Sequence, residues 1–274
     1  EEDIKKKYGD TFTRSFNTIL KDKNVPSLII ATPINSHYRL VKQALMSDKN
    51  VLVEKPLAKN PSQAKELLTI SRKRGLKLET EYTFTYSQAL STAQKLISDG
   101  TIGSLESITI SKKQLGRFLP YDVYNLLGTH CLAILDMFLP ISKYKFQAKP
   151  LITHKQKTTA AIIYFEERKK LKNICGHIDL SLHCQSKETK MAIYGKKGTL
   201  IYTPNSANTL SLTCFSRFQL DGGNKVAILR EKAFSTEENH NIQLALKHFS
   251  KVLGNKLPDN SKRALDVTKV LSEF

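Results

Sequence analysis

Residues 27–37 read SLIIATPINSH and residues 51–58 read VLVEKPLA. Each stretch opens with a continuous apolar run, which is typical of a strand buried on both faces of a parallel sheet. Between the two stretches, apolar residues recur at spacings of three and four, which indicates one buried face of a helix. The residues on that face are Leu40, Val41, Ala44 and Leu45. The region therefore predicts a strand, a helix and a second, parallel strand.

Capping residues mark the starts of two helices in this region. Asn35 or Ser36 can cap the first helix, because a short polar side chain accepts a hydrogen bond from a free amide of the first turn. The second helix has Asn60 as its cap, a proline at its first position and a glutamine three residues after the cap. Residues 76–80, which read LKLET, follow this helix and are expected to form a third strand.

From about Ile102 the sequence changes to longer stretches that are rich in β-branched residues, and it returns to helical spacing near its end. The strand-like stretches are residues 105–111, 158–165 and 174–182, and the helical ones are 130–138, 241–253 and 261–271. We therefore expect an α/β protein with two domains. Residues 1–103 would form a partial, Rossmann-like parallel-sheet domain, and residues 104–274 an α+β domain with a large, mostly antiparallel open sheet.

The charge balance favours anionic ligands. The 274 residues include 43 Lys and Arg against 25 Asp and Glu, a formal net charge of +18. Lysines are scattered along the whole chain and no nucleic-acid motif surrounds them, so we expect a solvated basic surface and no nucleic-acid partner. A positive field would still favour small anions such as dinucleotides or nucleotide sugars.

Two other classes of protein are not favoured. The sequence has no apolar run of the roughly 18 to 20 residues that a membrane helix needs, and its first ten residues are too charged for a secretion signal. We therefore expect a cytoplasmic protein without a membrane partner. The four cysteines are widely spaced and form no CxxC pair, so we expect neither a disulfide nor a metal site.

The loops that follow the predicted strands are the places to look for chemistry, because an open parallel sheet binds ligands beyond the carboxyl ends of its strands. Residues 31–37 end at a helix N-terminus, whose free amides suit an anionic ligand. Glu54, Lys55 and Pro56 follow the next strand. Taken singly, each feature has a structural alternative, such as a surface position for His37 and a solvated ion pair for Glu54 and Lys55.

Together the two loops resemble the core signature of the family that includes glucose-fructose oxidoreductase and inositol dehydrogenase, the Gfo/Idh/MocA family. The resemblance rests on the order and spacing of Ile30-Ala31-Thr32-Pro33 through His37 and of Val51 through Ala58. It continues in residues 99–103, in Leu127-Gly128-Thr129-His130 followed by Asp136, and in residues 194–200. It therefore covers nearly the whole chain.

The resemblance implies an oxidoreductase that uses NAD or NADP and transfers hydride to or from a sugar, nucleotide sugar or cyclitol. It places Lys55 near the nicotinamide and the reacting carbinol, and gives His130 the role of proton acceptor or substrate anchor. It also implies a homodimer or homotetramer formed through the second-domain sheet. The predicted cofactor contacts are Thr32, Pro33, Asn35, His37, Glu54, Lys55, Pro56 and Tyr82.

The sequence departs from the family pattern in three places. A GxGxxG-type turn that would hold the pyrophosphate is absent before residue 27, so we expect the natural protein to carry further residues upstream. Leu126 stands where many members carry an aspartate four residues before the histidine. Asp122, eight residues before His130, is the candidate to replace the carboxylate of that aspartate. Thr83 stands in place of a common arginine. A non-catalytic relative that senses a ligand or binds a partner is therefore the alternative, and His130 could simply be a buried, hydrogen-bonded histidine.

Overall fold

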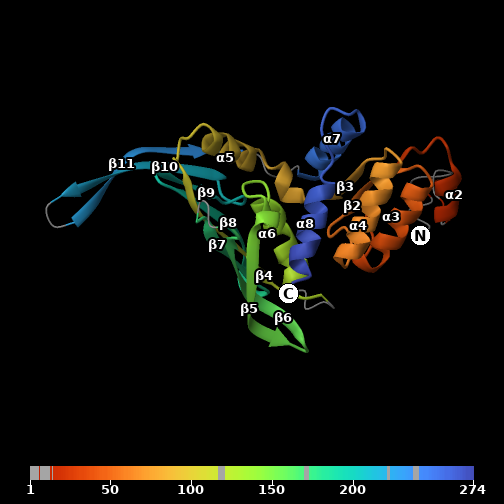
Figure 1. Ribbon diagram of the computed structural model, residues 1–274, viewed down its shortest axis with the longest axis horizontal. Helices are drawn as coiled ribbons and strands as arrows, with labels where there is room; N and C mark the ends of the chain where they lie inside the picture. The colour runs from red at the N-terminus through yellow and green to blue at the C-terminus, as the bar shows by residue number, and fades with distance from the viewer. Residues whose placement is uncertain are drawn as a thin grey trace. The chain divides into compact units, whose positions relative to one another are not determined.

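The computed structural model describes residues 6, 13, 15–116, 121–169, 173–220, 223–236 and 241–274. The chain divides into two compact units (Figure 1). Unit 1 comprises Glu1–Glu81 and Phe249–Thr268, and unit 2 comprises Tyr82–His248 and Lys269–Phe274. The chain thus leaves unit 1 after the third strand and returns to it near its end.

Unit 1 is a parallel sheet with helices, as the apolar runs predicted. Within the described residues its sheet has three strands in the order β1-β2-β3, and both neighbouring pairs are parallel. The elements in chain order are α2 (Phe16–Lys21), β1 (Ser27–Ile30), α3 (Ile34–Met46), β2 (Asn50–Glu54), α4 (Pro61–Lys73) and β3 (Leu78–Glu81). Figure 1 shows α3 and α4 next to each other beside this sheet.

The predicted N-cap is confirmed for α4 and wrong for α3. The cap of α4 is confirmed, because the Asn60 side chain accepts a hydrogen bond from the Gln63 amide at 3.0 Å. The expectation that Asn35 or Ser36 caps α3 is wrong, because the helix begins earlier and its N-cap is Pro33. The Ser36 hydroxyl instead donates to the Pro33 carbonyl at 2.8 Å.

The outer edge of β3 is closed by the turn that leads into α8 (Ser261–Leu271). The Asn260 side chain accepts a hydrogen bond from the Thr80 amide at 2.8 Å and donates one to the Thr80 carbonyl at 2.7 Å. The Glu79 carboxylate, which is fully buried, accepts a hydrogen bond from the Asn260 amide at 2.8 Å. A side-chain amide thus supplies the hydrogen bonds that a further strand would otherwise make at this edge.

Unit 2 is built on an open sheet of eight described strands in the order β11-β10-β9-β8-β4-β7-β6-β5. Every neighbouring pair is antiparallel except β4 and β7, which confirms the predicted, mostly antiparallel sheet. The strands are β4 (Leu105–Leu115), β5 (Tyr144–His154), β6 (Lys157–Glu167), β7 (Cys175–Ser181), β8 (His183–Gly195), β9 (Gly198–Tyr202), β10 (Leu210–Leu220) and β11 (Gly223–Phe234). Figure 1 shows β10 and β11 as a long hairpin.

Short helical segments accompany this sheet. They are η2 (Thr83–Tyr86), α5 (Gln88–Ser98), the π-helical turn η3 (Tyr124–Gly128), α6 (Thr129–Leu135) and η4 (Ile141–Lys143). Except for His130, every residue of α6 is buried, so this helix forms the core of the unit together with the sheet. The chain then continues through α7 (Asn241–Leu253) and α8, both with the bounds that the sequence predicted.

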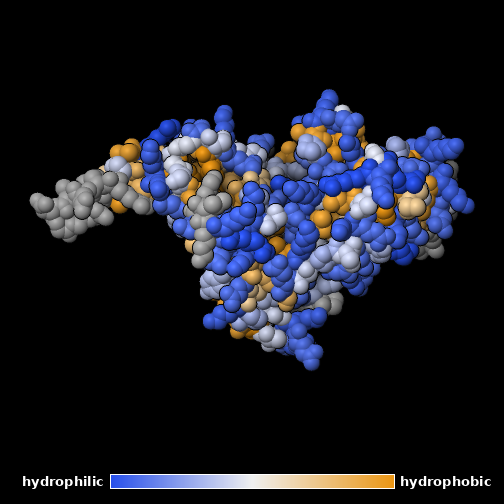
Figure 2. Space-filling view, in the orientation of Figure 1, coloured by the Kyte–Doolittle hydropathy of each residue, from blue (hydrophilic) through white to orange (hydrophobic). Residues whose placement is uncertain are grey.

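Hydrophilic side chains cover most of the visible face of the molecule (Figure 2), in keeping with the 25% of residues that are charged. Within the described part of the chain, none of the helices is both long and apolar enough to span a membrane.

Candidate functional site

The loops that follow β1 and β2 are joined by one buried side chain. His37, on the first turns of α3, is only 1% exposed. Its Nδ1 lies 2.8 Å from the carbonyl oxygen of Pro56, and its Nε2 lies 2.6 Å from the carbonyl oxygen of Thr32. Both carbonyl oxygens can only accept a hydrogen bond, so the ring nitrogen that carries the proton is the donor to its carbonyl. His37 is therefore not a surface histidine, and it ties the TP loop of β1 to the EKP loop of β2.

Replacing His37 with leucine is expected to destabilise unit 1 by about 1 to 3 kcal/mol, because a carbonyl oxygen near the sheet rim loses its hydrogen-bond donor. Chemical denaturation of the purified variants measures the change. Arg39→Leu, at an exposed position of the same helix, is the control and should have little effect. Equal stability of the two variants would show that the ring does not hold the loops together.

Lys55 lies at the carboxyl end of β2, where the sheet register aligns Glu54 with Glu81 at the end of β3. Burial lowers the pKa of Lys55 from 10.5, and the charges of Glu54 and Glu81 act in the opposite direction. The peptide bond between Lys55 and Pro56 is cis. Desolvation is thus the dominant effect on this lysine, and a lysine with a lowered pKa can release and take up a proton nearer to neutral pH.

The lowered pKa of Lys55 predicts a pH dependence of stability. Between the pKa in the folded protein and that in the unfolded chain, the unfolded chain binds more protons, so the free energy of unfolding rises with pH. The wild type should therefore gain stability relative to Lys55→Met as the pH rises from neutral towards 10.5. Urea denaturation of both proteins across this range measures the difference. A difference that does not change with pH would contradict the buried position of the Lys55 ammonium group.

Unit 2 places two predicted site residues near one aromatic ring. Tyr82 is 1% exposed, and its carbonyl accepts hydrogen bonds from the Thr85 amide at 2.7 Å and hydroxyl at 2.8 Å, which begins η2. This turn carries Phe84, whose ring meets the His130 imidazole edge-on with 5.4 Å between centroids. The contact fixes the imidazole plane of His130, which sits on α6 in a half-buried position.

Lys112 is a member of this cluster that the sequence analysis missed. Its side chain is 5% exposed, and its Nζ lies 4.2 Å from the centroid of the Phe84 ring and 3.0 Å from the Thr189 hydroxyl. A cation over an aromatic face is attracted by the ring quadrupole, more strongly when it is desolvated. A signal was present, because Lys112 continues the inward alternation of Ile108 and Ile110 along β4.

Asp122 acts as a cap in the structure. Its carboxylate accepts hydrogen bonds from the Asn125 amide at 2.8 Å and the Asn125 side chain at 3.1 Å, at the start of the helical segment. Eight helical residues correspond to about 12 Å along the axis, so the position is two turns from His130. A part for Asp122 in proton transfer stays a prediction that these contacts do not support.

A comparison with known protein families bears on unit 1. Residues 1–82 match the family described as "Oxidoreductase family, NAD-binding Rossmann fold". This is the Gfo/Idh/MocA family that the TP and EKP motifs resemble. The N-terminal part of the chain, residues 1–82, is therefore similar to this oxidoreductase family. The matching residues include every predicted cofactor contact from Thr32 to Tyr82, whereas Asp122 and His130 lie beyond them.

Curated oxidoreductases match about a third of the chain. YhhX of Escherichia coli, an uncharacterized oxidoreductase, is 33% identical over 97 residues, which are 35% of this chain and 28% of the relative. The dTDP-3,4-didehydro-2,6-dideoxy-alpha-D-glucose 3-reductase of Streptomyces antibioticus is 35% identical over 102 residues, or 37% of this chain and 31% of the relative. The matched stretch thus spans less than a third of the length of either protein.

Solved structures of oxidoreductases share the fold of almost the whole chain. A 3-ketoreductase from Actinomadura kijaniata, in complex with TDP-benzene and NADP, has a TM-score of 0.75 at 16% identity and covers 99% of this chain and 83% of its own. The UDP-N-acetylglucosamine 3-dehydrogenase of Acidithiobacillus ferrooxidans has a TM-score of 0.78 at 15% identity, over 99% and 84%. At these identities the likeness is one of fold.

Proposed function

We propose that the protein is an NAD(P)-dependent oxidoreductase that transfers hydride to or from a carbinol carbon of a sugar, nucleotide sugar or cyclitol. Lys55 carries the proposal. It lies directly beyond the carboxyl end of a parallel strand, where such sheets bind ligands, and its pKa is lowered by burial. The proposal draws further support from the match of residues 1–82 to a family of NAD-binding oxidoreductases and from the similarity to a nucleotide-sugar reductase and a nucleotide-sugar dehydrogenase.

The residues around the α3 N-terminus fit a dinucleotide. The helix has 13 residues, and its N-cap, Pro33, has no side chain that could satisfy the first free amides. These amides and the helix dipole suit an anionic group. Thr32 and Asn35 are exposed beside them, and the His37 ring holds the loop in place. The bound nicotinamide would accept or supply the hydride.

The side chains of the protein would transfer the proton that accompanies the hydride. Oxidation of a carbinol removes a hydride from carbon and a proton from the hydroxyl group, and reduction of the carbonyl returns both. Burial lowers the pKa of Lys55, which favours its neutral amine; in that form it would take up the hydroxyl proton on oxidation and, as the ammonium, give it back on reduction. His130, held edge-on by Phe84, would anchor the substrate hydroxyls.

The test combines binding and turnover. Thermal unfolding in the presence of NADH and of NADPH measures binding, because a ligand of the folded state raises the melting temperature. The absorbance of the reduced nicotinamide then reports turnover with a panel of sugars, nucleotide sugars and cyclitols. A melting shift with turnover on one member supports the proposal. A melting shift without turnover on any member favours the non-catalytic relative. The absence of a shift with either dinucleotide, both in this chain and in one that carries the expected upstream residues, contradicts both the cofactor and the reaction.

Two finer expectations belong to the same proposal. A homodimer or homotetramer would form through the open sheet of unit 2, and sedimentation of the purified protein measures its size. The cytoplasm would be the place of the reaction, and fractionation of cells that express the protein tests this.

A further inference from the structure

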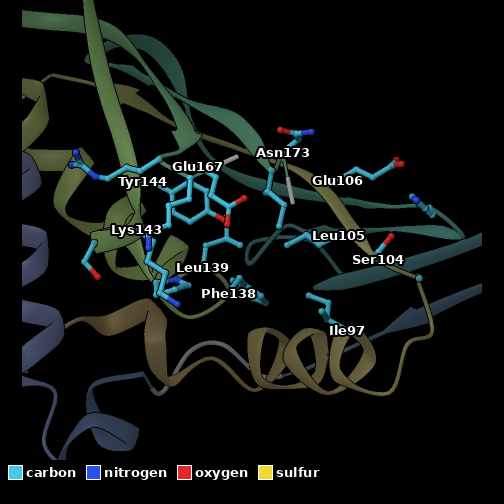
Figure 3. A pocket seen from close by; sticks show the side chains of 17 residues that line it. Ile97, Ser104, Leu105, Glu106, Phe138, Leu139, Lys143, Tyr144, Glu167 and Asn173 are labelled. Atoms are coloured by element: carbon cyan, nitrogen blue, oxygen red, sulfur yellow. The ribbon is translucent and has the colours of Figure 1, made fainter. Parts of the chain in front are cut away.

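Unit 2 contains a cavity that Phe84, Lys112 and His130 do not line. Its volume is about 1210 Å³, which is room enough for a molecule of nucleotide size. It lies between α5, the segment that follows α6 and the beginnings of β4 and β5 (Figure 3). The proposed reaction therefore does not use this cavity.

The inner wall of the cavity is apolar and fixed. Leu139, Tyr144 and Ile174 line it and are each 4% exposed, and Ile97 and Phe138 add further apolar surface. Figure 3 shows Ile97 on α5, with Phe138 and Leu139 on the other side of the space. Burial, together with the charge of Glu167, raises the pKa of Tyr144 to about 12, so its hydroxyl stays protonated and can donate a hydrogen bond. Such a wall suits the apolar body of a ligand.

The rim of the cavity is basic. Four cationic residues from three segments line it, against the two acids Glu106 and Glu167. The cations are Lys143, Arg168, Lys169 and Lys196. Their backbone positions are set by hydrogen bonds, since the Arg168 amide donates to the Lys143 carbonyl at 2.9 Å and the Lys196 amide to the Ser104 carbonyl at 3.0 Å.

Among the residues that the structure describes, none of these four cationic groups has an acidic partner within ion-pair distance. Elsewhere, surface cations do have such partners. Lys42 lies 2.6 Å from Glu66, and Arg74 lies 2.6 Å from Asp48. The basic groups at the cavity are therefore available to an anion.

We propose that this cavity binds a small organic anion, in which a phosphate or carboxylate group is joined to an apolar or aromatic body. The body packs against Leu139, Tyr144 and Ile174, and the anionic group lies among the cations of the rim. Arg168 offers a planar fork that matches both kinds of oxyanion. The inference is independent of the proposed reaction, because the two sets of residues do not overlap.

The test uses 1-anilinonaphthalene-8-sulfonate, a fluorescent probe with an aromatic body and an anionic group, on the full chain. The double variant Arg168→Glu with Lys196→Glu should bind the probe at least about tenfold more weakly, as expected when two charge-assisted contacts become repulsive. Lys187→Glu with Lys190→Glu is the matched control, because both lysines are exposed on β8 of the same unit and do not line the cavity. This control should bind the probe as the wild type does.

Competition then identifies the body of the ligand. Dodecyl phosphate and adenosine monophosphate share the anionic group and differ in the apolar part, so displacement of the probe by one of them names an aliphatic or an aromatic ligand. Displacement by either, in the wild type and not in the Arg168 and Lys196 double variant, supports the proposal. Equal probe affinity of the two double variants, or no displacement by either competitor, overturns it.

Discussion

Lys55→Met is expected to lower kcat/KM for hydride transfer by about a hundredfold to ten-thousandfold, the usual cost of losing a positioned acid or base. The methionine keeps the volume and the apolar stem of the lysine but cannot exchange a proton. Burial disfavours the charged form of Lys55, so the variant, which lacks the ammonium group, should be close to the wild type in stability near neutral pH. The rate of nicotinamide oxidation with the substrate found in the panel measures the first effect, and thermal unfolding measures the second.

Lys59→Met is the control for this prediction. Lys59 follows the EKP motif in the same loop and is exposed. It has the same side chain as Lys55 in different surroundings. It should retain wild-type turnover. If both variants retain turnover, Lys55 takes no part in the proton transfer. If Lys55→Met loses dinucleotide binding as well as turnover, the side chain is needed for the cofactor rather than for the proton.

Local sequence signals predict the part of the fold that depends on local interactions. The bounds of α7 and α8 follow from apolar spacing alone, and the start of α4 follows from the Asn60 cap, whose hydrogen bond the structure contains. β5 is not predicted, because the alternation of its first residues ends after Ala148 and the rest of the strand is exposed. The parallel pairing of β4 with β7 is also not predicted, since residues about 68 positions apart are paired by the tertiary fold and carry no local pattern.

The candidate site shows the same division. Spacing identified the TP and EKP loops, because they lie at strand ends, but it did not show that His37 joins them through two backbone carbonyls. Lys112 was missed because a lysine counts as a solvent-facing residue in a sequence pattern. In the structure it lies at an inward position of β4 over the ring of Phe84. A charged residue at an inward strand position is therefore worth examining before the fold is known.

Gly176→Ala is expected to destabilise unit 2 by about 3 kcal/mol or more, which is the upper range for an overpacked core. A methyl group on Gly176 would lie 1.8 Å from the Ile108 carbonyl oxygen and 2.6 Å from Cζ of Phe165. Gly176 is aligned with Ile108 on β4 and with Phe165 on β6, so both neighbouring strands would have to move. Chemical denaturation followed by circular dichroism measures the change.

Gly254→Ala separates this clash from the general effect of replacing a glycine. A methyl group there would meet its nearest neighbour, the Ser250 carbonyl oxygen, at 3.6 Å, which is ordinary contact, so this variant should unfold at about the wild-type denaturant concentration. Because β4 also carries Lys112, a shift of that strand in Gly176→Ala should move the Lys112 ammonium from the Phe84 ring. Equal unfolding midpoints of the two variants would mean that β4, β7 and β6 do not approach closely at Gly176.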